Sequence, residues 1–207
     1  MADHYYSAFP ESEHNLKEFT TAFRGNEFRF RTDAGVFSRE RLDLGTRILV
    51  ESLDLTGVMT PLDLGCGYGP IGLGIAEELP QITVYMSDIN TRATELAKEN
   101  ALLNGIKNIL IKEGNGFEPW KTLFATGLRF DLIVTNPPLR TGKKTVLGLF
   151  NEARKYLVPH GSLWAVIKTS QGAKTYLREL EEIFGFAEVV EVKSGYRVIR
   201  AEKEIEA

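Results

Sequence analysis

Three glycines spaced two residues apart constrain the fold of this chain more than any other feature. Gly65, Gly67 and Gly69 follow the short run 62–64, which is apolar except for one acid, and a helical pattern of apolar residues begins at Pro70. Proline suits the first turn of a helix, where its missing N–H leaves no hydrogen bond unmade. Glycine lets the backbone turn sharply and approach a ligand closely. The segment therefore predicts a buried strand, a tight turn and the start of a helix.

The glycine spacing distinguishes between kinds of nucleotide site. The dinucleotide fingerprint has its third glycine three residues after the second, whereas Gly67 and Gly69 are two apart and Pro70 occupies the fingerprint's position. With Asp63 two residues before Gly65, the motif resembles the acid-x-Gly-x-Gly-x-Gly turn of class I methyltransferases that use S-adenosylmethionine (AdoMet). The turn alone does not exclude a binding site for a different nucleotide.

Strand and helix patterns alternate along the rest of the chain. A Ser194-Gly195 turn near the end separates two extended runs, so the last strand is expected to be antiparallel, either inserted in the sheet or at its edge. This order predicts an α/β fold with a doubly wound, mostly parallel, Rossmann-like sheet of seven strands, one of them antiparallel. Besides the strand at 62–64, we expect strands at 82–86, 109–111, 130–135, 162–167, 188–193 and 196–201. Helices are expected from 70 and at 91–104, 145–157 and 173–184.

Residues 1–55 are expected to form an extension that packs on an AdoMet-binding catalytic domain of residues 56–207 as one structural unit. The polar segment 1–15 is interpreted as an arm. A turn at Gly25-Asn26 predicts a β-hairpin within 16–32. A helix is expected over 41–53, with Ser38 as its N-cap. Its expected apolar stripe is Leu44, Ile48, Leu49 and Leu53.

The composition excludes several classes of protein. Hydrophobic residues make up 43% and charged residues 26% of the chain, as in ordinary globular proteins. A net charge of -3 gives no general attraction to nucleic acid, so such binding would need a local basic patch. The single cysteine and the scattered histidines indicate neither a disulfide nor a metal site. With no apolar run of about 18 residues and no signal peptide, we expect a cytoplasmic protein without membrane contact. The sequence does not decide between a monomer and a dimer.

Two polar residues follow expected strands at the edge where ligands of open α/β sheets bind. Asp88 ends the second strand, 23 residues after Gly65, and its carboxylate could accept hydrogen bonds from two ribose hydroxyls. Alternatively, Asp88 or Asn90 caps the helix that follows. Asn115 lies between two glycines beyond the third strand, where it could accept the amino group of adenine or simply form a turn.

The tetrapeptide Asn136-Pro137-Pro138-Leu139 follows the fourth strand directly and is the most informative motif for catalysis. An exocyclic amine is a poor nucleophile because its lone pair is delocalised. An enzyme can localise that lone pair by accepting both N–H hydrogens, and it can aim the nitrogen at a sulfonium methyl group. The side-chain oxygen of Asn136 and the carbonyl oxygen of Pro137 are the expected acceptors, and the two prolines stiffen the loop. A strand-terminating turn is the alternative interpretation.

Together these motifs resemble the methyltransferase small-domain family, whose best-known members methylate the guanine-N2 amine of small-subunit ribosomal RNA. The resemblance covers nearly the whole chain and is carried by residues 32–38, 62–69, 136–138, 168–174 and 195–198. It implies that Gly35, Val36 and Phe37 close over AdoMet, and that S-adenosylhomocysteine is the product. It further implies that Asp63, Gly65 and Gly67 hold the methionine end and that Asp88 holds the ribose. Cys66 is interpreted as a small filler beside the cofactor. The expected cofactor-binding residues are Phe37, Asp63, Gly65, Cys66, Gly67, Gly69, Asp88, Ile89, Asn115 and Asn136.

One departure from the family pattern leaves the target base open. Many amine-methylating relatives have an aromatic residue after Asn-Pro-Pro, whereas this chain has Leu139, so Phe37 would supply the stacking surface instead. Arg140, Lys143 and Lys144 are expected to bind RNA phosphates. A second group of arginines in the extension is expected near the same site: Arg24, Arg29, Arg31, Arg39 and Arg41. A solvated charged surface is the alternative for both groups.

The leading hypothesis is an enzyme that methylates guanine N2 of 16S ribosomal RNA, either free or in the small subunit. The alternatives are methylation of cytosine N4, of a protein glutamine or of a small-molecule amine, and an assembly module that binds AdoMet and RNA without turnover. A nicotinamide oxidoreductase is disfavoured by the glycine spacing.

Overall fold

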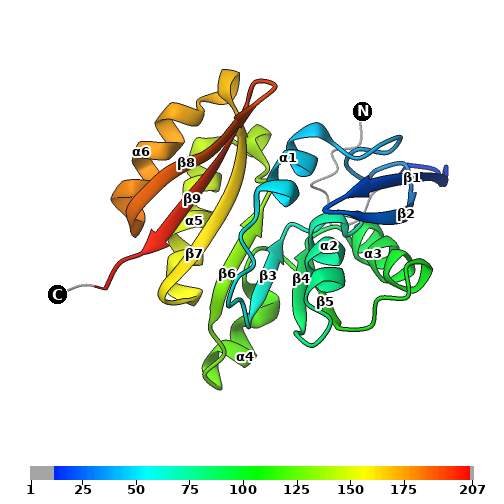
Figure 1. The fold of residues 1–207 in the computed structure, drawn as a ribbon, viewed down its shortest axis with the longest axis horizontal. Helices are drawn as coiled ribbons and strands as arrows, with labels where there is room; N and C mark the ends of the chain where they lie inside the picture. The colour runs from blue at the N-terminus through cyan, green and yellow to red at the C-terminus, as the bar shows by residue number, and fades with distance from the viewer. Residues whose placement is uncertain (1–11, 206–207) are drawn as a thin grey trace.

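The computed structural model describes residues 12–205, so most of the expected arm at 1–15 lies outside the described residues. A seven-stranded sheet forms the centre of the protein, in the order β5-β4-β3-β6-β7-β9-β8 (Figure 1). Its strands are β3 (Pro61–Leu64), β4 (Val84–Asp88), β5 (Ile109–Glu113), β6 (Phe130–Thr135), β7 (Leu157–Lys168), β8 (Gly185–Lys193) and β9 (Tyr196–Lys203).

The direction of the strands confirms the expected fold class. Strands β3 to β7 pair in parallel, while β9 lies between β7 and β8 and is antiparallel to both. The antiparallel strand is thus inserted in the sheet and does not form its edge. The chain builds β3, β4 and β5 outward in one direction and then returns to place β6 on the other side of β3. At such a switch point the connections diverge and leave a crevice at the carboxyl ends of the strands.

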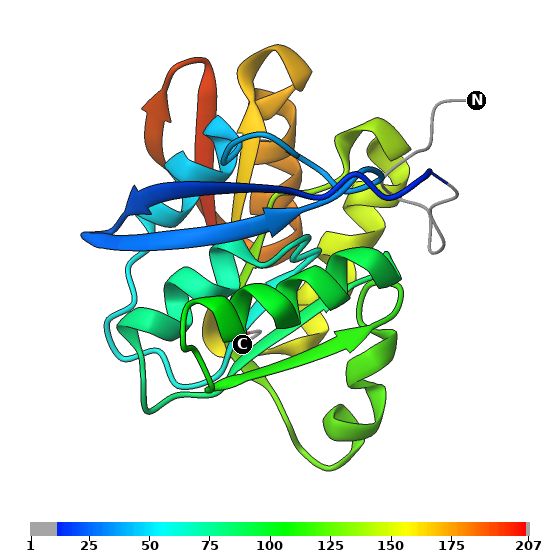
Figure 2. The ribbon, with the colours of Figure 1, turned by 90° about the vertical axis from the view of Figure 1, so that its right-hand side faces the viewer.

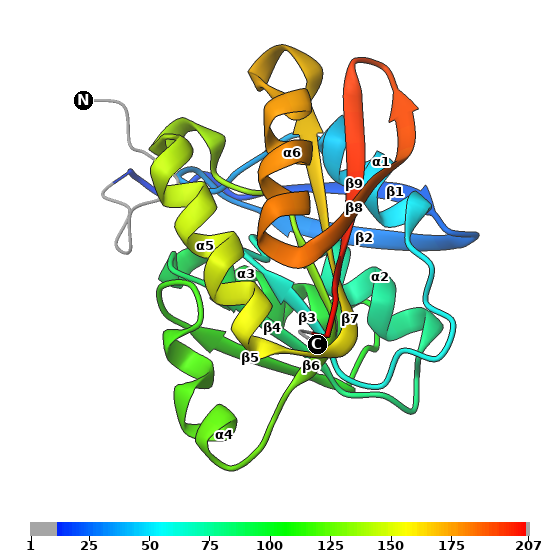
Figure 3. The same cartoon turned by 90° about the vertical axis from the view of Figure 1, so that its left-hand side faces the viewer.

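Helices cover both faces of the sheet. On one face lie α1 (Leu44–Ser52), α2 (Pro70–Glu78) and α3 (Thr91–Leu103), as seen in Figure 2. On the other lie α4 (Lys121–Ala125), α5 (Lys143–Tyr156) and α6 (Ala173–Phe184), of which α5 and α6 face the viewer in Figure 3. Alternation along β6 serves both layers, because Leu132 and Val134 pack under the first set and Ile133 under the second.

The expected N-terminal hairpin forms from β1 (Lys17–Phe23) and β2 (Asn26–Thr32) and lies across α3 (Figure 2). Buried Phe28 and Phe30 join the core on the α1–α3 face. The backbone of β2 is also bonded to α3, because the N–H groups of Arg29 and Arg31 donate to the side-chain oxygens of Asn104 and Asn100. The extension therefore packs against the core through both apolar and polar contacts.

The start of the first helix differs from the prediction. Helix α1 begins at Leu44, not at residue 41, and its N-cap is Asp43, whose carboxylate accepts the N–H of Thr46 at 2.9 Å. The hydroxyl of Ser38 instead donates to the carbonyl of Arg41 and stabilises the preceding turn. Leu44 is 45% exposed and is not part of the apolar stripe. Asp43 caps the helix in place of Ser38 because its carboxylate lies directly before the helical turn whose free N–H groups need an acceptor.

Other boundaries also moved. Strand β7 begins at Leu157, about five residues earlier than expected. The stretch between β5 and β6 contains a single-turn helix, η1 (Glu118–Trp120), followed by α4, neither of which the sequence indicated. These two elements are too short to show a helical apolar period. Two further single turns, η2 (Leu139–Thr141) and η3 (Thr169–Gln171), follow β6 and β7.

Candidate active site

A cavity of about 370 Å³ opens at the carboxyl ends of the central strands. Its walls come from the turns after β3, β4, β5 and β6, from the start of β9, and from the segment that leads into α1. The lining residues that enter the argument below are Phe37, Asp43, Thr46, Gly65, Cys66, Gly67, Asp88, Ile89, Asn115, Asn136, Pro137, Pro138, Leu139, Arg140, Lys168, Gln171 and Tyr196. The sequence-predicted residues at the ends of four different strands therefore meet in one cavity.

The three glycines of the turn have two different roles. Gly65 and Gly67 have φ values of 77° and 55°, and a Cβ at either position would have no atom within 4 Å. Both therefore adopt a backbone conformation that side chains disfavour, beside open space in the cavity. A Cβ on Gly69 would instead lie 3.2 Å from Leu73 Cδ1 and 3.3 Å from Ala97 Cβ. Gly69 does not line the cavity but lets α2 pack closely against α3.

Asp63 lies beneath the turn and is fully buried. Its Oδ2 accepts the N–H of Gly72 at 2.8 Å, which ties β3 to the first turns of α2. Burial, opposed by the Gly72 hydrogen bond and helped by the nearby charge of Asp88, raises the pKa of Asp63 to about 7. Asp63 does not line the cavity, so it can influence a ligand there only through the backbone of the turn.

Asp88 ends β4 and faces the cavity. Its Oδ2 accepts the N–H of Gly67 at 2.8 Å and its Oδ1 accepts the N–H of Asn90 at 2.9 Å. Burial raises the pKa of this carboxyl, opposed by these N–H donors. The helix cap expected from Asp88 or Asn90 comes from Asn90, which accepts the N–H of Ala93. Each carboxylate oxygen retains a lone pair for a ligand.

Asn115 and Ile89 complete this side of the cavity. Asn115 is exposed, and its carbonyl oxygen accepts the N–H of Glu118 at the start of η1. The turn interpretation of Asn115 is thus visible in its backbone, while its side chain remains available to a ligand. Cys66 is buried in the turn, where burial raises the pKa of its thiol well above the ordinary value, so it is no nucleophile.

Asn136 follows β6 and projects toward the N-terminus of α1. Its Nδ2 donates to Thr46 Oγ1 at 3.0 Å and to Asp43 Oδ2 at 3.3 Å. Within residues 12–205, no group donates a hydrogen bond to Asn136 Oδ1. The carbonyl oxygen of Pro137 accepts the N–H of Leu139 at 2.8 Å and keeps one lone pair. The tetrapeptide thus offers two oxygen acceptors at the cavity.

The basic residues are distributed differently from the prediction. Arg140 lines the cavity, whereas Lys143 forms an ion pair with Glu179, and Lys144 is exposed on the first turn of α5 outside the cavity lining. None of the extension arginines is among the described cavity residues. Arg24 binds Glu78 and the carbonyl oxygens of Val50 and Leu53, and so serves the fold.

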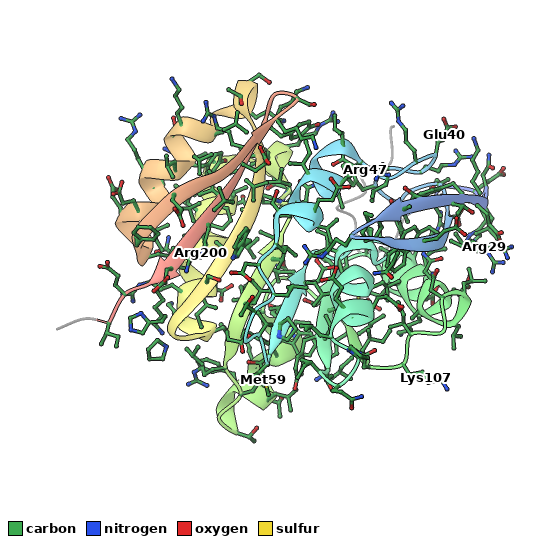
Figure 4. The ribbon with its side chains drawn as sticks, in the orientation of Figure 1. Arg29, Glu40, Arg47, Met59, Lys107 and Arg200 are labelled. Atoms are coloured by element: carbon green, nitrogen blue, oxygen red, sulfur yellow. The ribbon has the colours of Figure 1, made fainter. Side chains whose placement is uncertain are left out.

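The two hairpin arginines on β2 also lie outside the cavity lining. Arg29 and Arg31 both pair with Glu18 across the hairpin, and Figure 4 shows Arg29 at the outer end of the molecule. Alternating charges along a strand point to the same face, so the arginines meet an acid on the neighbouring strand before they can meet a distant ligand.

Several cavity residues were not predicted as site residues: Asp43, Thr46, Lys168, Gln171 and Tyr196, the last three of which lie in segments that carried the family resemblance. Asp43 and Thr46 have the spacing of a helix cap, so attention to the acid nearest the helix would have found them. Lys168 and Tyr196 pair across β7 and β9. They reach the cavity only because β9 is inserted beside β7, which no local pattern reveals.

The cavity fits a nucleoside-containing cofactor. The two glycines leave room for a close approach of the ligand to backbone, and Asp88 offers acceptors at the position where a ribose binds in open α/β sheets. Asp43 and Asp88 place two carboxyl groups in the lining, which favours a positively charged ligand group. AdoMet, with its sulfonium and ribose, has these properties. Residues 12–205 hold no group of three or more His, Cys, Asp or Glu side chains that could bind a metal ion.

A Rossmann-like sheet with this turn and this cavity defines the class I methyltransferase type of fold. The family model of the methyltransferase small domain matches residues 27–200, and the chain belongs to that family. This confirms the resemblance that the motifs indicated. None of the helices within residues 12–205 is both long and apolar enough to cross a membrane.

Three proteins that are similar to this chain are informative. The uncharacterized protein YbxB of Bacillus subtilis (strain 168) is 41% identical over 204 residues, which cover 98% of this chain and 100% of that protein. The ribosomal RNA small subunit methyltransferase C of Citrobacter koseri is 30% identical over 190 residues, covering 90% of this chain and 53% of that protein. The solved structure of the T. thermophilus 16S rRNA N2 G1207 methyltransferase, in complex with AdoMet and guanosine, matches with a TM-score of 0.79 and 28% sequence identity. The match covers 91% of this chain and 51% of that one. The chain thus spans about half the length of these two methyltransferases.

Proposed function

We propose that this protein is an AdoMet-dependent N-methyltransferase that acts on an exocyclic base amine of RNA, namely guanine N2 of 16S ribosomal RNA. The observation that carries the proposal is the position of Asn136. Its side-chain oxygen is unbonded within residues 12–205 and lies at the cavity that also contains the glycine turn and Asp88. An amine acceptor and a cofactor site therefore share one space.

The cofactor half of the cavity is assigned to the turns after β3 and β4. Gly65 and Gly67 leave room for the methionine end of AdoMet, and Asp88 accepts hydrogen bonds from the ribose hydroxyls. Asp63 holds the turn from below through Gly72. Ile89 and Asn115 border the adenine. The bound cofactor supplies an electrophilic methyl group on its sulfonium.

The substrate half is assigned to the tetrapeptide after β6. Asn136 Oδ1 and the carbonyl oxygen of Pro137 accept the two N–H hydrogens of the target amine. This localises the nitrogen lone pair and fixes its direction, so positioning supplies most of the catalysis. No strong base is needed, because the nitrogen becomes acidic once it has four substituents.

The choice of RNA is supported by the similar proteins and by the substrate side of the cavity. The T. thermophilus protein is a 16S rRNA N2 guanine methyltransferase that was solved with guanosine. In this chain, Phe37 lines the cavity and is 37% exposed. Its aromatic ring could stack on a base, whereas Leu139 has no ring. Arg140 in the cavity lining and the exposed Lys143 and Lys144 at the start of α5 are assigned to RNA phosphates, and Lys143 would exchange its partner Glu179 for a phosphate. A ribosomal substrate would place the protein in the cytoplasm.

The test is methyl transfer from AdoMet with a labelled methyl group. The substrates are 16S rRNA, assembled small subunits and, as a control, large subunits, and the labelled nucleosides are identified after digestion. We expect N2-methylguanosine from one of the first two substrates and none from the third. N4-methylcytidine would replace the proposed base, and label in protein would replace the proposed substrate class.

Two variants connect that result to the site. Asn136→Ala should abolish transfer while AdoMet binding stays within several-fold. Asn151→Ala is the matched control, because Asn151 is an exposed asparagine on α5 whose side chain donates to the carbonyl of Leu147 in the same helix. Unchanged turnover in Asn136→Ala would remove the role assigned to Asn136.

A further inference from the structure

The N-terminus of α1 holds the asparagine of the tetrapeptide in a short hydrogen-bond network. Asp43 Oδ2 accepts from the N–H of Thr46 at 2.9 Å, from Thr46 Oγ1 at 3.3 Å and from Asn136 Nδ2 at 3.3 Å. Thr46 Oγ1 also accepts from Asn136 Nδ2 at 3.0 Å. Thr46 is only 4% exposed, so water competes little for these bonds. Residues 90 and 93 positions apart in the sequence are thus joined at the cavity.

The donors and acceptors in this network fit together in only one direction. A carboxylate oxygen can only accept, so the group of Asn136 that faces Asp43 must be the NH₂. The hydroxyl of Thr46 donates its single hydrogen to Asp43 and presents a lone pair to the NH₂ group of Asn136. Turning the amide over would place its oxygen against the Asp43 carboxylate with no hydrogen between them, and Thr46 could donate to that oxygen only by giving up its own bond to Asp43. The amide oxygen of Asn136 is therefore the atom left for the cavity.

This direction matters because an asparagine can present either end of its amide. The NH₂ end facing a base amine would bring two donors together and could not localise the lone pair of the amine. We propose that Asp43 and Thr46 are positioning residues that fix the Asn136 amide with its oxygen toward the substrate. The inference rests on the proposed function for its catalytic consequence, but the orientation itself is a property of the protein without substrate.

The place of α1 relative to β6 makes the network possible. Helix α1 contacts β7 and β9, and its first turn packs tightly on Tyr196. A Cβ at Gly45 would lie 2.8 Å from Tyr196 Cε1, so glycine permits the approach of the helix to β9. Close packing at Gly45 thus holds the cap of α1 within bonding distance of Asn136.

Kinetics of conservative variants provide the first test. Thr46→Val removes the hydroxyl with little change of shape, and Asp43→Asn keeps a good helix cap but can present an N–H to Asn136. We expect each to lower kcat roughly 10- to 100-fold, the range that one or two misplaced hydrogen bonds produce. The Kd for AdoMet and the KM for RNA should stay within about threefold. Thr46→Ser should restore kcat.

A matched control separates this role from a purely structural one. Thr94 is a buried threonine near the start of α3, its hydroxyl donates to the carbonyl of Thr91, and it does not line the cavity. Thr94→Val should leave kcat unchanged. Full kcat in both Thr46→Val and Asp43→Asn would overturn the proposal, as would an equal loss in Thr94→Val.

The orientation is read independently of catalysis by NMR of the ligand-free protein. The side-chain amide resonances of Asn136 are assigned from their loss in Asn136→Ala. We expect both amide hydrogens to be shifted and protected in the native protein and to move toward free-asparagine values in Thr46→Val and Asp43→Asn. Unshifted resonances in the native protein overturn the inference. If the resonances behave as expected but no RNA is methylated, the orientation stands and the proposed function fails.

Discussion

The backbone N–H of Gly67 donates a hydrogen bond to Oδ2 of Asp88, with an N to O distance of 2.8 Å. This bond joins the turn after β3 to the end of the neighbouring strand β4. The glycine that leaves room for a ligand and the carboxylate that would bind it are therefore held at a fixed separation before the ligand arrives. Such preorganisation lowers the cost of binding.

Gly67→Ala should weaken cofactor binding by more than its effect on stability explains. Gly67 and Gly105 have similar positive φ values of 55° and 71°, and a Cβ at either position would have no atom within 4 Å. Alanine at either site should cost about 1 kcal/mol of stability. Only the Cβ at residue 67 enters the cavity, so we expect the Kd for AdoMet to rise tenfold or more in Gly67→Ala and to be unchanged in Gly105→Ala. Calorimetry and denaturant unfolding measure both quantities, and equal Kd values would contradict the assignment.

Asp88→Asn should raise the Kd for AdoMet roughly 10- to 100-fold, because the amide offers one acceptor where the carboxylate offers two. Asp54→Asn is the control, since Asp54 is exposed and bonds to the N–H of Thr56 outside the cavity. Isothermal calorimetry on both variants checks the prediction. An Asp88→Asn protein that binds as the native protein does would exclude ribose binding by this residue.

Asp63 should make the native fold less stable as the pH rises. Its pKa is raised from 3.8 to about 7 in the folded protein, so between these values the folded state holds a proton that the unfolded state has lost. The contribution is therefore full below about pH 4 and disappears as the pH rises through about 7, with a total of up to about 4 kcal/mol.

Asp63→Asn tests this, because the amide oxygen still accepts from Gly72 but cannot titrate. The free energy of unfolding is measured by guanidinium denaturation at pH 5 and pH 8. We expect the free energy of unfolding to fall less between pH 5 and pH 8 in the variant than in the native protein. Parallel pH dependences in the two proteins would contradict the raised pKa.

Arg24→Ala should lower the free energy of unfolding by about 2 kcal/mol, because it removes donors from the carbonyl oxygens of Val50 and Leu53 as well as the partner of Glu78. Arg29→Ala, which breaks an exposed pair with Glu18, should cost clearly less than Arg24→Ala. Denaturant unfolding compares them. We expect RNA affinity to be the same in Arg24→Ala as in the native protein. A selective loss of RNA binding would instead assign Arg24 to the RNA-binding surface.

Arg140→Gln should weaken RNA binding and reduce its dependence on salt. Removing one phosphate contact lowers the slope of log K against log salt by about 0.7 for a single strand. Lys107→Gln is the control, because Lys107 follows the end of α3 at the edge of the molecule opposite β8 (Figure 4). Filter binding over a series of salt concentrations measures the slope. Equal slopes for the two variants would exclude a phosphate contact by Arg140.

The fold could be predicted because its signals are local. The glycine turn, the β-branched run of β6 and the Ser194-Gly195 turn each define a strand or its end within a few residues. The doubly wound, mostly parallel sheet then follows from the rules for parallel crossovers, whereas the position of the antiparallel strand does not. The short elements η1 and α4 were missed because one or two helical turns leave no period to detect.

The site was only partly predictable for the same reason. The motifs after β3, β4 and β6 lie on neighbouring strands, so their meeting follows from the fold. Asp43 and Thr46 reach Asn136 only through the packing of α1 on β7 and β9, and Arg24 turns to Glu78 only because the hairpin folds back. Tertiary packing decides these pairings, and a charge in the sequence does not reveal its partner.

The insertion of β9 between β7 and β8 has a consequence for biosynthesis. It places Tyr196, which lines the cavity, against Gly45, which precedes it by 151 residues in the sequence. This wall of the cavity can therefore close only after β9 has left the ribosome. We expect cofactor capture to follow the synthesis of β9, in contrast to the early folding that the glycine turn alone would permit.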